Sequence, residues 1–558
     1  MASPSRAQES VAGPPVDLII RGSVEQIHIL HAPPRSAVSV DGPNGFKTTA
    51  TTDPLGGLIL RNLPPADRYQ VTVAGQQPAH VRVMPRDVHP QPDFYSSQKL
   101  DPTRGYITTR DGTKLCYRVV LPDRKLHGPG PYDLIITYSG YQPGLKTTDA
   151  HQNIPFEKFS ALGYAVAGVN MRGSGCSGGA FDFMEPLTWL DGYDMVEAFA
   201  AQPWVDNVAL GDQSWPGLTQ LYVASTQPPS LDAIVAGSVV GDFYRDVFYP
   251  GGIPNIGFGH LWPGGRDAEN AWPTRRREVN ELVKIDPVAA ANQALRGQNI
   301  NLVETIRKHP EYDDYWTRRS AERLVSRIKV PVLQVVSWQD PQVGGRPATL
   351  VEHYAESTPV RLVGVNGFHQ YWHGDVFNEI TQFLEVYLKK RDPQAIAAYE
   401  SHDRFVALVE SDDRGRTRGR FTLSSLPTKG EGRRFLLRSE LAADDADNGG
   451  ATSTFRYDAS KPGSWTSPAQ DQSAFTSKPL ETQLVLAGPG SADLWISAAA
   501  EDVDLQITLS EVRPDGLEML IQSGWLRASH RALDEPASSP LRPVHPHTRE
   551  AAQKLVPG

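Results

Sequence analysis

The chain has little cysteine, no long apolar run and no excess of positive charge, and each absence excludes a class of protein. Only two cysteines occur in 558 residues, so a small scaffold stapled by several disulfides is excluded. No window approaches the roughly 18 uncharged apolar residues of a membrane-spanning helix. The net charge is −9, and no basic stripe is present that would hold a phosphate backbone. We therefore expect neither nucleic acid nor a membrane as a partner.

The two cysteines, Cys116 and Cys176, lie outside any Cys-x-x-Cys or Cys/His cluster with metal spacing. We expect two buried free thiols, with a single bridge as the alternative. The first ten residues have no apolar stretch of the kind that signal peptides carry, so the sequence favours the cytoplasm. A secreted protein whose signal had been removed would look the same. We expect no metal and no cofactor.

The length predicts about three to four domains of roughly 100–200 residues each. Residues 1–15 are polar and proline-bearing, and we expect them to be loose. In residues 16–85, short apolar alternations are separated by clusters of turn residues, which indicates a small β-sandwich. We expect a structural role for this domain, with binding of a carbohydrate or a protein partner as the alternative.

Residues 100–395 change to buried strands that alternate with helical stretches, which is typical of a mostly parallel, doubly wound sheet. The expected strands are 134–138, 164–169, 208–210, 233–236, 330–336 and 360–365. A charged stretch rich in Trp and Tyr, residues 241–326, interrupts the alternation. We expect it to form a helical cap over the sheet edge, where substrate choice is usually made in this architecture.

Residues 402–558 return to a β pattern. Residues 503–510 alternate apolar and polar side chains, residues 513–516 form a turn, and residues 517–526 return. With strands also expected at 484–486 and 494–496, this pattern indicates a two-sheet domain. Closing strands are not evident after it, so we expect either a truncated domain or one with exposed edges.

Three short motifs in the α/β region place a serine, an aspartate and a histidine in the chain order that α/β-hydrolases use. Gly211-Asp-Gln-Ser-Trp-Pro-Gly217, Ser337-Trp-Gln-Asp340 and Asn366-Gly-Phe-His369 each follow an apolar run that reads as a buried strand. Ser214 would be the nucleophile, His369 its general base, and Asp340 the carboxylate that fixes the imidazole tautomer. His373 is the rival base, four residues further along the loop.

A serine nucleophile also requires donors that hold the developing oxyanion. The backbone N–H of Trp215 is the first candidate, because it follows the nucleophile directly. The second should come from the loop after an early strand, Ser139-Gly-Tyr-Gln-Pro143, where Tyr141 could supply its hydroxyl; a packing aromatic is the alternative. In α/β-hydrolases the nucleophile sits on a sharp strand-to-helix turn, the nucleophile elbow, which usually carries Gly two positions before the serine. Asp212 occupies that position here, and it could crowd the turn or change the charge beside Ser214.

Several motifs, in order along the chain, resemble the cocaine-esterase and X-prolyl dipeptidyl-peptidase family of serine hydrolases. They are Asn170-Met-Arg-Gly-Ser-Gly-Cys-Ser-Gly-Gly179, Asp191-Gly-Tyr-Asp194 with Gln202-Pro-Trp204, Ser214-Trp-Pro-Gly-Leu-Thr-Gln220, Tyr249-Pro-Gly-Gly252, Asp313-Asp-Tyr-Trp316 and Trp338-Gln-Asp340. The resemblance spans roughly residues 105–558. It implies an α/β-hydrolase core, a helical cap and a C-terminal jelly-roll β-sandwich, with the nucleophile at Ser214, the acid at Asp340, the base at His369 and the oxyanion tyrosine at Tyr141.

The leading hypothesis is a serine hydrolase that cleaves an ester or amide through an acyl-enzyme. An X-prolyl dipeptidyl peptidase is the alternative within this class, and it would need a carboxylate to hold the substrate ammonium. Asp242, Asp246, Asp313 and Asp314 are available for that task, but nothing in the sequence places them in the pocket. A binding protein built on an inactive hydrolase scaffold is the alternative of another class.

Aromatic side chains of the 241–326 stretch suggest an apolar pocket for a small ester, an amide or a short peptide. The candidate pocket residues are Phe243, Tyr244, Phe248, Trp262 and Trp338. The oligomeric state is left open, with a homo-oligomer as one outcome.

Three other motifs carry weaker signals. Residues 172–179 resemble a phosphate-binding loop but lack its Gly-Lys-Ser/Thr ending, so we expect a tight structural turn. Residues 444–450 are acidic, but the glutamate that completes an EF-type calcium loop is missing, so we expect a solvated loop. His545 and His547 have no partner at metal spacing, and we expect them at the surface.

Overall fold

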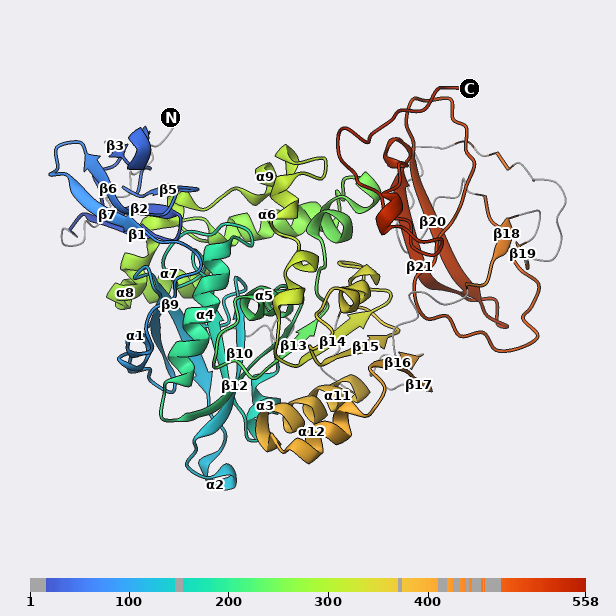
Figure 1. Cartoon of the computed structure of the whole chain (residues 1–558), viewed down its shortest axis with the longest axis horizontal. Helices are drawn as coiled ribbons and strands as arrows, with labels where there is room; N and C mark the ends of the chain where they lie inside the picture. The colour runs from blue at the N-terminus through green and yellow to red at the C-terminus, as the bar shows by residue number, and fades with distance from the viewer. Residues whose placement is uncertain are drawn as a thin grey trace, which may run out of the picture.

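The structure, a computed structural model, describes residues 17–145, 154–369, 374–409, 419–424, 432–437, 441–443, 453–454, 456 and 473–558. The expected loose segment 1–15, the rival base His373 and the acidic loop 444–450 therefore lie outside the described residues. Figure 1 shows the chain as an α/β core, with an N-terminal β domain on one side and a C-terminal β domain on the other. The fold class predicted from the sequence is confirmed.

A ten-stranded sheet forms the core, in the order β17-β16-β15-β14-β13-β12-β10-β11-β9-β8. The strands from β10 to β16 pair in parallel, and the outer pairs at each edge are antiparallel. The strands are β8 (Arg104–Thr108), β9 (Lys114–Val120), β10 (Tyr132–Ser139), β11 (Ala165–Asn170), β12 (Val205–Gln213), β13 (Ala233–Gly237), β14 (Val332–Ser337), β15 (Val360–Val365), β16 (Phe405–Val409) and β17 (Gly419–Leu423).

Helices cover both faces of this sheet, because its central strands are apolar on both sides. On β10, Leu134 and Ile136 face one core cluster, which α4 (Pro186–Ala200) and α5 (Ser214–Ser225) share, whereas Ile135 faces the opposite cluster. That second cluster is covered by α3 (Phe156–Ala161), α11 (Gly374–Leu384) and α12 (Pro393–Glu400) (Figure 1). Shorter helices are α1 (Pro92–Ser96) and α2 (Arg124–His127).

The segment between β13 and β14 is helical and lies beyond the carboxyl ends of the strands. It contains α6 (Phe258–Asn270), α7 (Arg277–Ile285), α8 (Pro287–Ala291), α9 (Leu302–Lys308) and α10 (Asp314–Thr317). Two hydrogen bonds from the backbone of α9 to Asp267 hold α6 in place, one from Leu302 (2.8 Å) and one from Val303 (3.1 Å). The cap is thus an ordered platform above the sheet edge.

Two small antiparallel sheets form the N-terminal domain, one of β1 (Ile19–Ser23), β2 (Gln26–Leu30) and β5 (Leu58–Leu60), the other of β3 (Ala37–Asp41), β4 (Lys47–Thr51), β6 (Ala66–Val73) and β7 (Ala79–Val83). The domain contacts the core through buried polar groups. The Ser23 hydroxyl donates to Asp111 (2.6 Å), and the Gln26 amide donates to Glu185 (2.8 Å). These groups would be costly to bury unpaired. Each domain therefore supplies hydrogen-bond partners for buried polar groups of the other.

The C-terminal domain contains two described antiparallel strand pairs, β18 (Phe435–Leu437) with β19 (Leu441–Ala443), and β20 (Asp504–Val512) with β21 (Glu518–Arg527). The predicted strand, turn and returning strand at residues 503–526 are confirmed. The strands expected at 484–486 and 494–496 are absent from the described structure, and that prediction was wrong. A strand requires a hydrogen-bonded neighbour, and neither run has one among the described residues.

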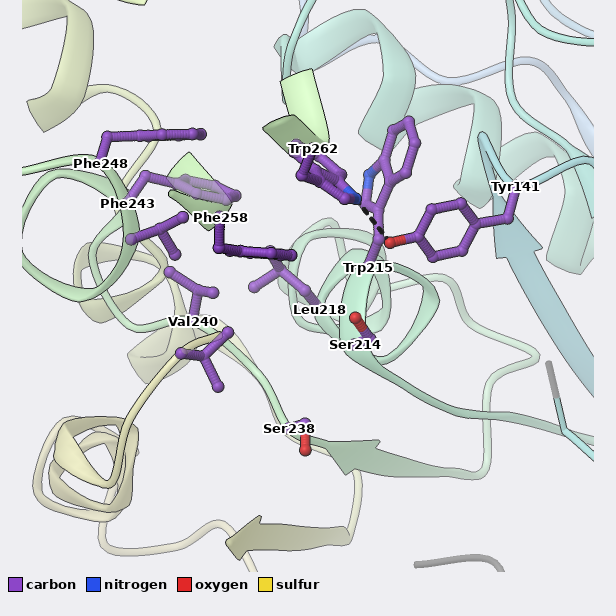
Figure 2. A pocket seen from close by; sticks show the side chains of 12 residues that line it. Tyr141, Ser214, Trp215, Leu218, Ser238, Val240, Phe243, Phe248, Phe258 and Trp262 are labelled. Atoms are coloured by element: carbon purple, nitrogen blue, oxygen red, sulfur yellow. Dashed lines mark hydrogen bonds between the residues drawn. The ribbon is translucent and has the colours of Figure 1, made fainter. Parts of the chain in front are cut away.

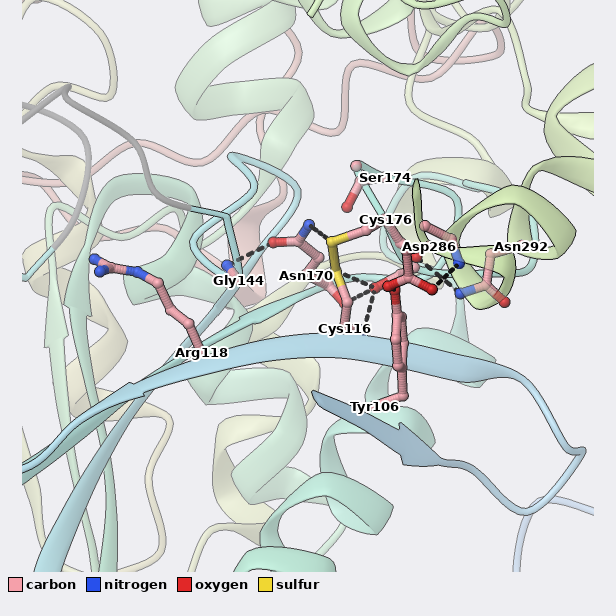
Figure 3. Close-up of a disulfide and its surroundings, with 12 residues drawn as sticks. Tyr106, Cys116, Arg118, Gly144, Asn170, Ser174, Cys176, Asp286 and Asn292 are labelled. Atoms are coloured by element: carbon pink, nitrogen blue, oxygen red, sulfur yellow. Dashed lines mark hydrogen bonds between the residues drawn. A yellow bond between two sulfur atoms is a disulfide. The ribbon is translucent and has the colours of Figure 1, made fainter. Parts of the chain in front are cut away.

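The expectation of free thiols was also wrong, since Cys116 and Cys176 form a disulfide (Figure 3). Cys116 lies on β9, and Cys176 lies in the loop that follows β11, which pairs with β9. Strand pairing brings the two Cα atoms to 5.7 Å, within the range of disulfides. The sequence alone does not show this proximity, because the two residues are 60 positions apart.

The glycine-rich loop at residues 172–179 is a structural turn, as predicted. A side chain at Gly173 would lie 1.9 Å from the backbone nitrogen of Phe181, so only glycine fits there. The carbonyls of Gly175 and Ser177 accept hydrogen bonds of 2.8 and 2.7 Å from the Arg296 guanidinium in the cap. The loop thus presents carbonyl groups to a cation, where a phosphate site would present N–H groups.

Candidate active site

The turn between β12 and α5 thrusts Ser214 out of the sheet. Ser214 has a φ of 63°, a left-handed conformation that is unusual for a residue with a side chain and is associated with functional sites. The turn is tight because α5 begins at Ser214 itself. At Gly217 a side chain would lie 2.5 Å from the Gly237 carbonyl oxygen and 2.8 Å from that of Asp212.

Asp212 does not crowd this turn. Its side chain is fully buried and accepts hydrogen bonds from the Thr137 hydroxyl on β10 and from the backbone N–H of Gln213. Burial raises the pKa of the Asp212 carboxyl to about 7, against the opposing effect of these hydrogen bonds and one from the backbone of Ile154. A buried carboxyl thus lies beside the turn and takes up a proton more readily than an exposed one.

Asp340 and His369 are brought together by neighbouring parallel strands. Asp340 follows β14 and His369 follows β15, so both lie at the edge of the sheet where β12 delivers Ser214. The Nδ1 atom of His369 is 2.7 Å from a carboxylate oxygen of Asp340. The other Asp340 oxygen accepts hydrogen bonds from the backbone N–H groups of Gln342 and Val343. This contact fixes the imidazole ring and directs its Nε2 atom away from Asp340.

The loops that carry Asp340 and His369 are braced by the C-terminal domain. Gln339 accepts a hydrogen bond from the Gly367 N–H (3.0 Å) and donates one to the Ile521 carbonyl on β21 (2.9 Å). Gln522, also on β21, donates to the Trp338 carbonyl (2.7 Å). The residues that flank Asp340 are therefore attached both to the loop of His369 and to the C-terminal hairpin.

Tyr141 lies in the loop after β10 and faces Ser214 (Figure 2). Its hydroxyl accepts a hydrogen bond of 2.7 Å from the indole N–H of Trp262 on α6. Burial raises the pKa of Tyr141, whereas the nearby Arg266 guanidinium and contacts with Trp262 and Ser214 lower it. The hydroxyl therefore keeps its proton and can donate it to an oxyanion formed beside Ser214.

A small apolar pocket opens beside Ser214, with about 360 Å³ of space between its walls, counting the part open to solvent. Its lining is Tyr141, Ser214, Trp215, Leu218, Ser238, Val240, Phe243, Val247, Phe248, Phe258, Trp262 and Val343 (Figure 2). The predicted pocket residues Phe243, Phe248 and Trp262 are among them. Val240, Val247 and Val343 were missed, because nothing in the local sequence distinguishes them from other buried valines.

Two predicted pocket residues lie elsewhere. Tyr244 is fully buried inside the cap, where its ring stacks on that of Tyr249, because the helical turn of residues 244–248 directs it away from the pocket. Trp338 packs against Phe405 and lines a different hollow, between the sheet edge and the C-terminal domain. His547, expected at the surface, is buried against Tyr244, and burial lowers the pKa of His547 to about 2.

Comparisons with known proteins agree with this architecture. The family model of the X-Pro dipeptidyl-peptidase (S15 family) matches residues 111–371, and that of the X-Pro dipeptidyl-peptidase C-terminal non-catalytic domain matches residues 406–557. The chain belongs to the cocaine-esterase and X-prolyl dipeptidyl-peptidase-like family. Because this is a family of hydrolases, the chain is identified as an enzyme. The family includes both esterases and peptidases.

Individual relatives are distant. A cocaine esterase of Rhodococcus sp. (strain MB1 Bresler) is 23% identical over 494 residues, covering 76% of this chain and 82% of the relative. The structure of a CocE/NonD family hydrolase from Staphylococcus aureus superposes with a TM-score of 0.61 at 21% identity, covering 81% of this chain and 80% of that one. An aminopeptidase from the marine sediment archaeon Thaumarchaeota archaeon gives a TM-score of 0.59 at 18% identity, covering 85% and 86%. Both structures therefore have the same fold as this chain.

The four aspartates considered for binding a substrate ammonium are engaged elsewhere. Asp242 pairs with Arg245 (3.0 Å), Asp246 pairs with Arg346 (2.7 Å), Asp313 caps α10, and Asp314 lies near Arg318 (3.5 Å). None of them lines the pocket beside Ser214. Among the residues that the structure describes, that lining contains no carboxylate.

Two general features of the chain bear on its surroundings. Within the described ranges, no group of three or more His, Cys, Asp or Glu side chains is arranged to hold a metal ion. In the same part of the chain, every helix is too short or too polar to cross a bilayer.

Proposed function

We propose that this chain is a serine hydrolase of the esterase or acylase type, which cleaves an ester or amide bond through an acyl-enzyme. The observation that carries the proposal is the contact between His369 Nδ1 and Asp340, at the same sheet edge as the strained turn that presents Ser214. A strained nucleophile elbow at the same sheet edge as an imidazole held by a carboxylate is typical of enzymes that carry out acyl transfer.

Each residue has one role in the proposed reaction. The Ser214 oxygen attacks the substrate carbonyl carbon, and its proton passes to Nε2 of His369. Asp340 accepts the Nδ1–H and stabilises the imidazolium that forms. The carbonyl oxygen, now an oxyanion, accepts hydrogen bonds from the Trp215 backbone N–H and the Tyr141 hydroxyl. His369 then returns the proton to the leaving alcohol or amine, and a water molecule repeats the cycle to release the acid.

The pocket favours an uncharged, apolar substrate group over the amino terminus of a peptide. An ammonium group buried in this apolar lining would lack a counterion, which is costly. The described lining offers aromatic and aliphatic side chains, two serine hydroxyls and one tyrosine hydroxyl. We therefore place esterase or acylase action ahead of X-prolyl dipeptidyl-peptidase action for this chain.

The disulfide bears on where the enzyme works. Disulfides persist in oxidising compartments and are rare in the cytosol, so we propose an oxidising compartment in place of the cytoplasm favoured by the N-terminal sequence. Alkylation of free thiols in the protein, as its source cells produce it, tests this: no free thiol is expected, and two would contradict the proposal.

The function is tested with Ser214→Ala and a panel of p-nitrophenyl esters and amino-acyl p-nitroanilides. We expect the wild type to turn over esters with apolar acyl groups and to be much slower on Xaa-Pro anilides. Without the nucleophile, kcat should fall by about 10⁴-fold or more. Ser96→Ala, which removes an exposed hydroxyl on α1, is the matched control and should retain full activity.

A fluorophosphonate probe gives an independent measurement. It should label Ser214 in the wild type and in the control, and mass spectrometry should find no label at residue 214 in the variant. Unchanged ester turnover by Ser214→Ala would refute the assignment of the nucleophile. Faster cleavage of Xaa-Pro anilides than of any ester would refute the substrate preference while leaving the nucleophile in place.

A further inference from the structure

The hydroxyl of Tyr141 lies between two elements that are far apart in the sequence. Tyr141 itself is on the loop after β10, and the indole that contacts its hydroxyl, that of Trp262, is on cap helix α6. The N···O distance is 2.7 Å, which is short for such a hydrogen bond. Figure 2 shows this contact directly above the Ser214 side chain.

The chemistry of the two groups fixes the direction of this hydrogen bond. An indole N–H can only donate, whereas a phenol hydroxyl has one proton to donate and lone pairs that accept. Tyr141 must therefore accept from Trp262, which leaves its own proton free to turn toward Ser214. Accepting a hydrogen bond also polarises the O–H group and strengthens it as a donor. Trp262 thus orients the Tyr141 O–H group and makes it a stronger hydrogen-bond donor to an oxyanion.

The surroundings hold the two rings in register. The Trp215 ring packs edge-on against both partners, with centroids 5.1 Å from Tyr141 and 5.1 Å from Trp262. Arg266, one helical turn after Trp262, places its guanidinium carbon 4.8 Å from the centre of the Tyr141 ring, and Arg266 is held by Glu269 at 2.6 Å. A nearby cation favours negative charge on the phenol oxygen, so α6 acts on Tyr141 through two side chains.

We propose that Trp262 is a positioning residue of the oxyanion hole, so that the cap supplies part of the stabilisation of the transition state. This inference rests on the proposed function, because it gives Tyr141 the role of oxyanion donor. Trp262 also lines the pocket, and its two roles are separable because the indole N–H contacts Tyr141 whereas the ring contributes apolar surface to the pocket wall.

A double-mutant cycle between Trp262 and Tyr141 tests the proposal. Tyr141→Phe should lower kcat for a p-nitrophenyl ester by about 100-fold. Trp262→Phe keeps a ring but removes the donor, and it should lower kcat by about tenfold, the size of one modest hydrogen bond. In the Tyr141→Phe background, Trp262→Phe should change kcat by less than about twofold, because the hydroxyl that it orients is gone. Trp262→His, which retains a ring N–H, should recover part of the loss.

Phe258→Leu is the comparison variant, because Phe258 lies on the same helix and lines the same pocket without contact to the Tyr141 hydroxyl. Its effect on kcat and KM should be the same factor in both Tyr141 backgrounds. Rates are divided by the amount of Ser214 that a fluorophosphonate titrates, so that misfolded molecules are not counted. Binding of an alkylboronic acid, whose tetrahedral adduct carries the oxyanion charge, should weaken about tenfold in Trp262→Phe.

The outcomes separate the inference from the function on which it rests. An equal loss from Trp262→Phe in both backgrounds, or unchanged kcat and boronate affinity, would overturn the role of Trp262. No loss from Tyr141→Phe would remove Tyr141 from the oxyanion hole and the inference with it, while the phosphonate labelling of Ser214 would still support a serine hydrolase. Retained turnover in Ser214→Ala would instead refute the proposed function itself.

Discussion

At the scale of single residues, Asp212 places an ionisable group in the sheet two positions before the nucleophile. Burial raises the pKa of its carboxyl to about 7, from an ordinary value of 3.8. The folded protein therefore binds this proton more tightly than the unfolded chain does. The stabilisation from proton binding is complete below pH 3.8 and is lost as the pH rises to about 7.

Asp212→Asn should remove this pH dependence, because an amide stays neutral and can still hydrogen-bond Thr137 and Gln213. We measure the free energy of unfolding of both proteins by denaturant titration. The difference, variant minus wild type, should increase between about pH 4 and pH 8 by up to about 4 kcal/mol. Asp67→Asn, at an exposed carboxylate, is the control and should show no such trend. A constant difference between Asp212→Asn and wild type at all pH values would contradict the prediction.

The local sequence predicted where the residues of the candidate site lie in the fold, but it did not predict which side chains they contact. Ser214, Asp340 and His369 each follow a recognisable strand, so their shared sheet edge could be predicted. The hydrogen bond between Trp262 and Tyr141 could not, because it joins a cap helix to a core loop and depends on how the cap is seated. The placement of Tyr244 failed for the same reason, since one turn of helix decides whether a side chain faces the pocket or the cap interior.

At the scale of elements, the elbow depends on a close approach of α5 to the sheet. Gly217→Ala would bring a methyl group to 2.5 Å from the Gly237 carbonyl oxygen and 2.8 Å from that of Asp212. Both are backbone atoms of neighbouring strands, so neither can rotate away. We expect the variant to lose about 1–3 kcal/mol of stability and, because Ser214 shifts with α5, about 10- to 100-fold in kcat.

Gly265→Ala is the matched control for this prediction. Gly265 is also inside a helix, α6, but a side chain there would meet no atom within 4 Å. Alanine favours a helix over glycine by about 1 kcal/mol, so the control should be neutral or slightly stabilising. Thermal unfolding and ester turnover measure both variants. A Gly217→Ala enzyme as stable and as active as the wild type would show that the elbow tolerates a side chain.

Elements with buried apolar runs were predictable, and so was the exposed hairpin of residues 503–526, whereas two other exposed apolar runs were wrongly predicted as strands. The runs at 134–138 and 360–365 became β10 and β15, because only a sheet covered on both faces buries such runs. The runs at 484–486 and 494–496 have the same apolar character, yet the Trp495 side chain is 99% exposed. Alternation predicts which side chains share a face, but it does not supply the neighbouring strand that makes a run into a sheet.

At the scale of the whole molecule, the domains meet through groups whose sequence positions give no hint of contact. Arg172 lies at the centre of one junction, pairing with Asp191 at 2.5 Å and with Asp111 at 3.2 Å. Asp111 in turn accepts the hydroxyl of Ser23 from the N-terminal domain. These side chains are buried, and removal of Arg172 would leave both aspartates without the cation that they share. The N-terminal domain is therefore attached to the hydrolase core through this buried cluster.

The disulfide is a second long-range connection, and its effect on the whole molecule can be measured. It joins β9 to the loop whose carbonyls, at Gly175 and Ser177, receive Arg296 of the cap. Closing a loop of 60 residues should stabilise the protein by about 4 kcal/mol through the unfolded chain. We expect Cys116→Ala with Cys176→Ala to lose about this amount in denaturant titrations.

A reductant should destabilise the wild type to a similar extent and leave the double variant unaffected, because alanine cannot be reduced. If the reductant destabilised both proteins equally, its effect would not come from this disulfide, and if it affected neither, the bridge would add nothing to stability. A loss of ester turnover that accompanies reduction while the protein stays folded would show that the loop transmits its position, through the cap, to the site of Ser214.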